Sequence, residues 1–309
     1  MSATLTFDGV SKWFGDTVAV AEVGFEIASG VTGLLGHNGA GKSTTLRMCA
    51  GFARPSAGTV RMLGVDPATD RDVHRRLGIV IDAEAIWPFL TPRRFVELEA
   101  RLRGVADPSD AARRALETVE MTDVADREVR GFSKGMRQRV KLAAALAHDP
   151  EILLLDEPLN GLDPRQRRHT IDLVRALGAE GRTIVVSSHV LHEVERMAPR
   201  VLVMVNGRLV AEGETHAIRA LLAERPRTMR IEVGSHAVAL AQTLIGDGVV
   251  DSVRLDGDGV VVETADVERL ARLLPIAARS AGATLKLIQP LDDDLESVYE
   301  YLHARSRGG

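Results

Sequence analysis

The chain has 309 residues, enough for one large domain and a smaller one, and its 27% charged residues leave a net charge of −4. This balance, without a long charged tail, argues against nucleic-acid binding, so we expect no nucleic-acid partner. No run approaches about 18 consecutive apolar residues, the N-terminus lacks a signal-peptide pattern, and the single cysteine, Cys49, excludes an internal disulfide framework, so we expect no membrane span and a reducing compartment.

The N-terminal segments 3–10 and 18–27 alternate apolar and polar residues, which predicts an antiparallel β edge before a strand at 30–35. Between them lies a turn with two aromatic residues, Trp13 and Phe14, in a chain with only 4% aromatics. Two interpretations stay open. One ring, Phe14 or Trp13, stacks on a purine, or both rings simply pack onto the sheet.

A glycine-rich loop follows strand 30–35 and leads into a helix-compatible segment. The loop residues are Gly36, His37, Asn38, Gly39, Ala40, Gly41, Lys42, Ser43 and Thr44. A strand, such a loop and a helix make up a phosphate-binding P-loop, in which backbone N–H groups and the helix N-terminus hold a polyphosphate. Lys42 is expected to neutralise the outer phosphates and the Ser43 hydroxyl to bind Mg²⁺. The alternative is a glycine-rich loop without a ligand, but the pattern arises by chance in about one in a hundred chains.

Strands and amphipathic helices follow in the next hundred residues. We expect strands at 58–64 and 77–81, and helices at 92–103, 108–120 and about 132–148. The first two helices begin at a proline that follows Thr or Asp, a common helix start.

The strand at 151–157 is apolar on both faces, which predicts a central place in a parallel sheet. It ends in two carboxylates, Asp156 and Glu157. Because the carboxyl ends of parallel strands meet at one edge, Asp156 is expected beside the P-loop, where it can hold the Mg²⁺ that Ser43 also binds. Glu157 can accept a proton from an attacking water. The alternative is a pair of acidic residues that cap the loop at Pro158.

The remaining elements complete two domains, predicted at 1–225 and 226–309, with a helical subdomain at about 83–146. In the first domain we expect a helix from 164 to 179, a strand at 183–188 ending at His189, and a hairpin at 201–210 turning at Asn-Gly. After a polar linker at 224–227, we expect strands at 229–233, 249–256, 259–263 and 284–289, and helices at 236–246, 266–281 and 292–304. This order predicts a small α+β domain, ferredoxin-like in type.

Taken in order, these motifs resemble those of the ATP-binding subunit of an ABC transporter over about residues 4–215. The matching segments are 36–44 for Walker A, 132–136 for the signature loop, 152–157 for Walker B with its catalytic glutamate, 160–163 for the D-loop, His189 for the switch histidine and Phe14 for the adenine-stacking aromatic. The resemblance implies a P-loop NTPase fold of the ABC type, α/β with a central, mostly parallel sheet, and ATP and Mg²⁺ as ligands. The signature loop and the extra C-terminal domain are similar to those of drug, antibiotic and lipid exporters.

The resemblance also assigns roles to single residues. Glu157, His189 and Lys42 are implied to be catalytic, with His189 contacting the γ-phosphate and orienting the water. Outside the P-loop, the nucleotide-binding residues are Phe14, Ser133, Gly135, Met136 and Asp163. The metal ligands are Ser43, Asp156 and Asp82.

A dimer is implied by the signature loop. Ser133 and the N–H of Gly135 stand at a helix N-terminus, where they form a second γ-phosphate site with no place to act within their own domain. In a head-to-tail dimer, the P-loop of one subunit and residues 133–137 of the other would sandwich each ATP, and hydrolysis would separate the subunits. We therefore expect a homodimer on the cytoplasmic face of the membrane that drives export through a separate permease.

One position departs from the family. Asp82 stands where the family usually has a glutamine that touches Mg²⁺; its carboxylate is shorter and anionic, and it can reach the metal directly or through water. Glu84 can substitute for it. The aromatic and apolar segment 86–91 forms either a groove for the coupling helix of a permease or ordinary core of the helical subdomain.

Two other functions stay open. A soluble ABC ATPase of translation or DNA repair usually carries two ATP-binding halves or a long coiled-coil insertion, and the sequence shows neither. A regulatory subunit that binds ATP without turnover has Asp82 as its only support. We therefore expect an ATPase coupled to transport.

Overall fold

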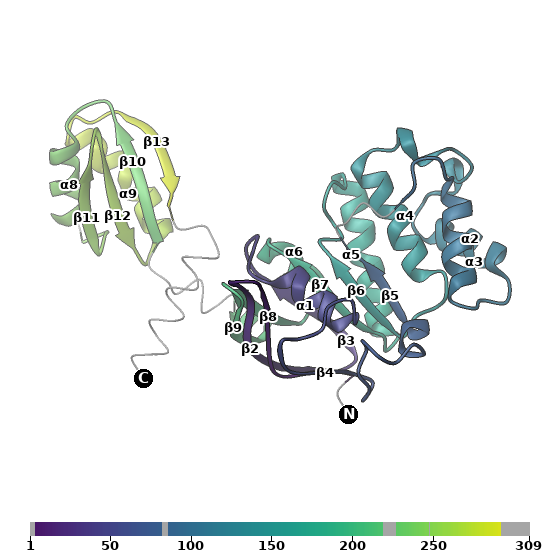
Figure 1. Ribbon diagram of the computed structural model, residues 1–309. Helices are drawn as coiled ribbons and strands as arrows, with labels where there is room; N and C mark the ends of the chain where they lie inside the picture. Colours follow the sequence, from purple (N-terminus) through teal and green to yellow (C-terminus); the bar gives the residue numbers. More distant parts are fainter. Residues whose placement is uncertain (1–3, 82–85, 219–226, 247, 292–309) are drawn as a thin grey trace. The chain divides into compact units, whose positions relative to one another are not determined.

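The computed structural model describes residues 4–81, 86–218, 227–246 and 248–291 (Figure 1). The chain divides into two compact units, Met1–His216 and Ala217–Gly309, which we call unit 1 and unit 2. The predictions for Asp82 and Glu84, and for a helix at 292–304, lie outside the described residues. Within those residues, every helix is too short or too polar to cross a lipid bilayer.

Unit 1 is built on a six-stranded sheet with the strand order β5-β6-β7-β3-β8-β9. The strands are β3 (Gly30–Leu35), β5 (Leu77–Val80), β6 (Ile152–Asp156), β7 (Thr183–Ser188), β8 (Arg200–Val205) and β9 (Arg208–Glu214). The first five in this order run parallel, and β9 pairs antiparallel with β8. All residues of β6 and β7 are buried, as expected of strands covered on both faces, and this confirms the central place predicted for 151–157.

The hairpin between β8 and β9 turns where the sequence predicts. Val205 pairs with Arg208, so the loop holds only Asn206 and Gly207. Both have a positive φ, 47° and 77°, the backbone region that a two-residue hairpin turn requires and that Asn and Gly tolerate best.

A second, antiparallel sheet has the order β2-β1-β4. Its strands are β1 (Leu5–Phe14), β2 (Thr17–Ile27) and β4 (Ala57–Met62). The alternating pattern therefore predicted an antiparallel pair correctly, because β1 and β2 are partners. The prediction gave β1 and β2 as an antiparallel edge before β3, but they form a separate sheet with β4. The antiparallel edge strand of the six-stranded sheet is β9. Alternation reveals a half-buried strand but not the sheet to which it belongs.

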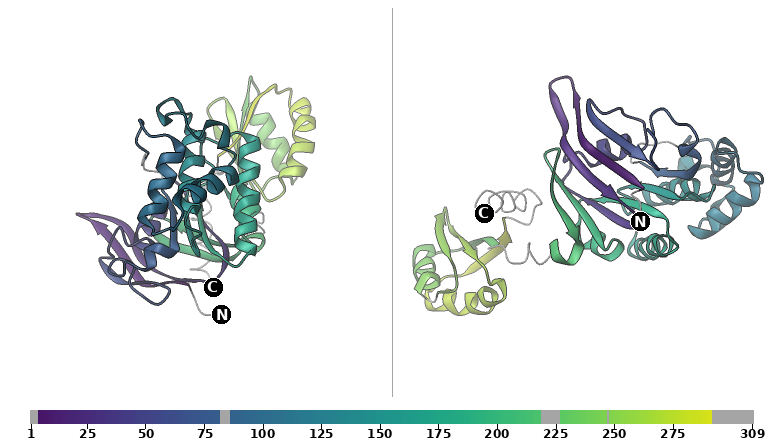
Figure 2. Two further views of the ribbon diagram at one scale, coloured as in Figure 1. Left: turned by 90° about the vertical axis from the view of Figure 1, so that its right-hand side faces the viewer. Right: turned by 90° about the horizontal axis from the view of Figure 1, so that it is seen from below.

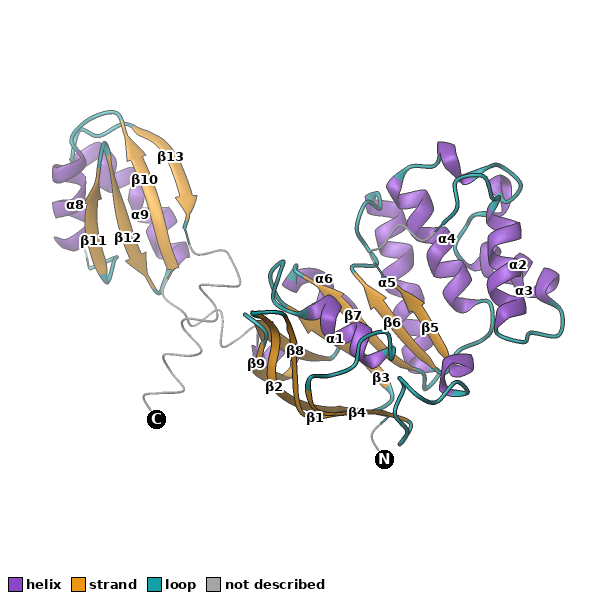
Figure 3. Ribbon diagram, viewed as in Figure 1, coloured by secondary structure: helices purple, strands orange, loops and turns teal. Residues whose placement is uncertain are grey.

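Helix α1 (Lys42–Cys49) lies between the two sheets (Figure 3). One buried apolar cluster joins all three parts, with Phe7 and Phe25 from the antiparallel sheet, Leu46 from α1 and Leu154 from the six-stranded sheet. The rings of Phe7 and Phe25 stack with their centroids 4.4 Å apart. Because α1 is packed on two sides, the loop that precedes it is held firmly at the carboxyl end of β3.

Helices α5 (Pro164–Ala179) and α6 (Leu191–Met197) cover the other face of the six-stranded sheet (Figure 2). A Cβ added at Gly33 of β3 would lie 2.2 Å from Cγ1 of Val194 in α6, so only glycine permits this close packing. Leu34, the next residue of β3, belongs to the cluster around α1 instead. This is the alternation expected of a strand between two layers.

A group of helices packs together beyond β5 (Figure 1). They are α2 (Pro92–Leu102), α3 (Pro108–Thr118) and α4 (Lys134–Leu146), and short 3₁₀ helices lie at Val73–Arg76, Thr122–Val124 and Val129–Gly131. Both predicted starts are confirmed: the side chain of Thr91 accepts a hydrogen bond from Arg94 N at 3.3 Å, and that of Asp107 accepts one from Asp110 N at 3.0 Å. These N-caps satisfy backbone donors that the first turn leaves unpaired.

Unit 2 contains an antiparallel sheet with the order β11-β12-β10-β13 and its own apolar core. Its elements in chain order are β10 (Arg227–Val233), α8 (Ala237–Gly246), β11 (Ser252–Asp256), β12 (Gly259–Thr264), α9 (Val267–Ser280) and β13 (Leu285–Pro290). Ile231 and Val262 from the sheet, with Leu240 of α8 and Leu274 of α9, lie in this core. Each described element agrees with its predicted range within a few residues.

A histidine next to α4 generates a prediction about pH. The Nε2 atom of His148 lies 3.1 Å from the carbonyl oxygen of Leu77, to which Arg103 also donates. Burial, followed by the charge of Arg103, lowers the pKa of His148 to about 4. In the unfolded chain this side chain takes up a proton near pH 6.5, so stability should be complete above that pH and fall as the pH drops towards about 4.

We expect His148→Gln to lose this dependence, because glutamine can still donate to Leu77 O without titrating. Between pH 7 and pH 5, the unfolding free energy of the wild type should fall by about 1–2 kcal/mol more than that of the variant. Urea unfolding at the two pH values measures this difference. His192→Gln, at an exposed histidine, is the control and should follow the wild type. Equal pH dependence in both variants would contradict the assignment.

Candidate active site

The loop between β3 and α1 is shaped by glycines that no other residue can replace. A Cβ at Gly36 would lie 2.5 Å from the carbonyl oxygen of Met204, and one at Gly41 would lie 2.6 Å from that of Ala19. Gly41 also has a φ of 101°, which other residues rarely adopt. The chain therefore runs tightly against β2 and β8.

Lys42 folds its side chain back over this loop. The ammonium is buried and donates to the carbonyl oxygens of Gly36 at 2.7 Å and His37 at 3.1 Å. It also lies 3.5 Å from Oε1 of Glu157. A buried ammonium needs such partners to offset its lost hydration, and here they hold a positive charge inside the loop.

The end of β6 is held by a hydroxyl from β7. Ser187 Oγ donates to Oδ1 of the buried Asp156 and accepts a hydrogen bond from Glu157 N at 2.9 Å. Glu157 has a φ of 47°, a left-handed conformation that costs a non-glycine residue about 1–2 kcal/mol. Gln138 Nε2 reaches the carbonyl oxygen of Glu157 at 3.5 Å, so contacts on both sides of the residue hold this turn.

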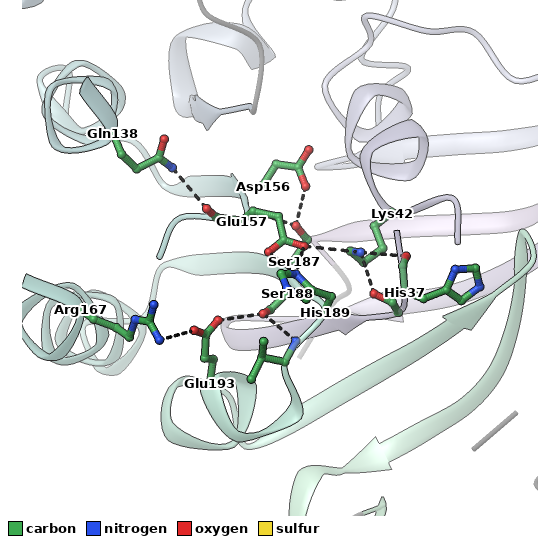
Figure 4. A network of polar contacts seen from close by, with 12 residues as sticks. His37, Lys42, Gln138, Asp156, Glu157, Arg167, Ser187, Ser188, His189 and Glu193 are labelled. Carbon is green, nitrogen blue, oxygen red and sulfur yellow. Dashed lines mark hydrogen bonds and ion pairs between the residues drawn. The ribbon is translucent and has the colours of Figure 1, made fainter. Parts of the chain in front are cut away.

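The turn directs the carboxylate of Glu157 to a position between Lys42 and His189 (Figure 4). Nδ1 of His189 lies 2.9 Å from Oε2 and 3.1 Å from Oε1 of Glu157. Whether Nδ1 acts as donor or acceptor in these contacts depends on the tautomer of the ring. The His189 side chain is 47% exposed, whereas that of Glu157 is 15% exposed. The histidine is therefore open to solvent while it contacts a nearly buried carboxylate.

A cavity of about 200 Å³ lies where these groups meet. It is lined by Ala19, Asn38, Gly39, Gly41, Lys42, Ser43, Thr44, Asp156 and Glu157. An ammonium, hydroxyls, carboxylates and the N-terminus of α1 together suit a polyphosphate bound with a hard cation. The structure thus brings the two predicted groups, the P-loop and the end of β6, to one cavity.

The aromatic and remaining loop residues lie differently. Phe14 is 55% exposed at the tip of the β1–β2 hairpin, with Lys12 Nζ 4.8 Å from its ring centre, and it does not line the cavity. Its exposure does not favour the alternative in which the ring packs onto the sheet. Nδ1 of His37 lies 2.7 Å from the carbonyl oxygen of Asn38, and Ala40 is buried.

The residues of the predicted signature loop and D-loop also lie away from the cavity. Ser133 is the N-cap of α4, and its Oγ accepts a hydrogen bond from Met136 N at 3.2 Å. Asp163 is the N-cap of α5 and accepts one from Gln166 N at 2.9 Å. A Cβ at Gly135 would lie 2.5 Å from the carbonyl oxygen of Gly161, so the starts of α4 and α5 are in tight contact.

The sequence did not predict the residues that hydrogen-bond to the backbone of the site without lining its cavity. Ser187 and Ser188 end β7, and Gln138 reaches over from α4. The available signal was a pair of adjacent serines after the apolar centre of a strand, residues 184–186, because buried polar groups need a partner.

Comparison with known proteins identifies the family. Residues 20–160 match the family model described as ABC transporter. The Nod factor export ATP-binding protein I of Burkholderia orbicola is 39% identical over 220 residues, 70% of this chain and 72% of that protein. The daunorubicin/doxorubicin resistance ATP-binding protein DrrA of Streptomyces peucetius is 34% identical over 255 residues, 81% and 77% of the two chains. A solved ATP-binding subunit of an ABC transporter, 26% identical, covers 71% of this chain and 93% of its own with a TM-score of 0.65. The chain therefore belongs to the ABC transporter family, as one of its ATP-binding, ATP-hydrolysing subunits.

Proposed function

We propose that this chain is the ATPase subunit of an exporter, bound to a separate permease at the cytoplasmic face of the membrane. The names of its relatives support export, since they describe Nod factor export and drug resistance. The observation that carries ATP hydrolysis is the contact of Glu157 with both Lys42 and His189 beside the P-loop cavity. A rival regulatory subunit without turnover would not need this arrangement.

The P-loop supplies the phosphate site. Its residues and the first turn of α1 line the cavity, where backbone N–H groups would hold the phosphates and Lys42 would exchange its carbonyl partners for the outer ones. Phe14, exposed at the tip of its hairpin, is free to stack on the adenine.

The donor groups of the cavity also fit Mg²⁺. Ser43 and Asp156 line it together, and Mg²⁺ is usually held by one or two carboxylates with substrate phosphates and waters. Among the described residues no cluster of three acidic, histidine or cysteine side chains offers an all-protein site, which agrees with this mode of binding. When bound, the ion would neutralise charge on the phosphates. Asp82 remains a proposed third ligand.

Glu157 acts as the general base and His189 as its positioning partner. The carboxylate accepts a proton from the attacking water, and His189, 2.9 Å from Oε2, fixes its direction and contacts the γ-phosphate. The left-handed turn at Glu157 places this carboxylate over the cavity instead of along the strand.

The second half of each site comes from another copy of the chain. Ser133, Gly135, Met136 and Asp163 lie outside the cavity of their own subunit, and Ser133 and Asp163 begin long helices. Helix N-termini attract phosphate, so these residues suit a nucleotide held by a second subunit. This supports a head-to-tail homodimer.

The domain formed by residues 226–309 is proposed to be ferredoxin-like; it makes up most of unit 2, which begins at Ala217. Its chain order of strand, helix, two strands, helix and strand, and its sheet order β11-β12-β10-β13, support this assignment. The similarity to known exporters extends into it: one Nod factor export protein, from Paraburkholderia xenovorans, aligns with 86% of the chain, more than unit 1 alone provides.

The role of Glu157 can be tested by Glu157→Gln, which keeps the shape of the side chain but removes the base. We expect ATP binding to persist, turnover to fall about 10²–10⁴-fold, and a dimer to accumulate with ATP. Steady-state ATPase assays and light scattering measure these effects. Glu180→Gln, at an exposed carboxylate, is the matched control. Wild-type turnover in Glu157→Gln would exclude Glu157 as the base.

The action of Ser133 across the dimer can be tested in the Glu157→Gln background. Adding Ser133→Ala should leave ATP binding to the single subunit intact but prevent ATP-dependent dimerisation. Fluorescent-nucleotide titration and light scattering separate the two. Ser109→Ala, at an exposed serine of α3, is the control and should still dimerise.

Because Ser133→Ala also removes a helix N-cap, worth about 1 kcal/mol, its unfolding midpoint is measured alongside. Loss of ATP binding in the single subunit, with an unchanged midpoint, would show instead that Ser133 serves its own nucleotide.

A further inference from the structure

A chain of polar contacts leads from α5 to the backbone beside His189 (Figure 4). Arg167 Nη1 of α5 lies 3.0 Å from Oε1 of Glu193 in α6. Ser188 Oγ donates to Oε2 of the same carboxylate at 3.0 Å and accepts a hydrogen bond from Val190 N at 3.0 Å. We call Arg167, Glu193 and Ser188 the Arg167 network.

The carboxylate of Glu193 is nearly buried and fully paired, although α6 is a short helix. Its side chain is 13% exposed, and each carboxylate oxygen has its own partner, the guanidinium of Arg167 or the hydroxyl of Ser188. A nearly buried carboxylate is costly without such partners, so loss of either should let the other contact shift. Arg167 is 42% exposed, and an ion pair at that exposure adds little to stability.

Ser188 joins this network to the P-loop. Its carbonyl oxygen accepts a hydrogen bond from Gly36 N at 3.3 Å, while its hydroxyl binds Val190 N and Glu193. The buried Ser188, directly before His189, is therefore bonded to the P-loop, and its hydroxyl also holds Val190, directly after His189. Ser188 thus holds the stretch of backbone from which the His189 side chain extends.

The other end of the network lies in the first turn of α5. Arg167 N donates to the carbonyl oxygen of Asp163 at 2.8 Å, and Asp163 caps the helix. The turn proposed to face a second subunit thus carries the guanidinium that holds Glu193.

We propose that Arg167, Glu193 and Ser188 are positioning residues for ATP hydrolysis. They hold the backbone at 188–190 so that His189 reaches Glu157, and they tie that position to the first turn of α5. This inference rests on the proposed role of His189. None of the three touches the reacting atoms, so they affect turnover only through the histidine.

The first test compares Arg167→Met and Glu193→Gln with the wild type. We expect kcat to fall about 10-fold in each, as is common when a supporting side chain of a site is removed, with the KM for ATP unchanged within about twofold. Arg168→Met changes the exposed neighbouring arginine and should keep wild-type kcat. Arg167→Lys, which retains the charge, should recover part of the loss. Unfolding midpoints show that all variants remain folded.

The second test asks whether the effect passes through His189. In His189→Ala, which should itself be slow, adding Glu193→Gln should lower kcat no further, because the ring that Glu193 positions is gone. An equal loss in both backgrounds would overturn the proposal, as would wild-type kcat in both Arg167→Met and Glu193→Gln.

The same variants distinguish failure of the positioning role from failure of the proposed role of His189. If His189→Ala is slow while Arg167→Met and Glu193→Gln both turn over at the wild-type rate, only the positioning role fails. If His189→Ala turns over at the wild-type rate, the proposed role of His189 fails, and the positioning role fails with it.

Discussion

Two neighbouring hydroxyls at the end of β7 hold the parts of the active site in place. Successive side chains of a strand point to opposite faces, so Ser187 and Ser188 serve different layers. Ser187 lies on the side of α1 and binds Asp156 and the backbone of Glu157. Ser188 faces α6, where it binds Glu193 and Val190 N. Because neighbouring side chains of β7 point to opposite faces of the sheet, this one strand positions Asp156 and Glu157 on one face. On the other face it holds the backbone around His189.

Backbone strain at Glu157 is a consequence of this arrangement. A regular continuation of β6 would carry the carboxylate along the strand, whereas the observed φ of 47° turns it back over the P-loop. A conformation that costs about 1–2 kcal/mol persists only where surrounding contacts hold it. Those contacts come from Ser187 and Gln138, which lie on β7 and α4. The site thus depends on elements that contribute no group to the cavity.

Local features could be read from the sequence, and long-range ones could not. The caps at Thr91 and Asp107, the Asn-Gly turn and the P-loop each depend on residues within a few positions of one another, so their patterns are visible in the chain. The contact of Ser187 with Glu157 joins residues 30 apart and exists only because β7 lies beside β6. Strand order also decided that β1 and β2 form a separate sheet. The networks behind the site therefore appear only once the topology is known.

The residues proposed to face a second subunit are also connected to the subunit's own site. Gly135 and Gly161 approach so closely that no side chain fits at Gly135, so the starts of α4 and α5 are in direct contact. The same first turn of α5 carries Arg167, whose guanidinium holds Glu193 and, through Ser188, the backbone beside His189. A displacement of that turn by a partner would change the position of His189 relative to Glu157. Under the proposed dimer, the surface that completes one nucleotide site therefore also adjusts the histidine of the other.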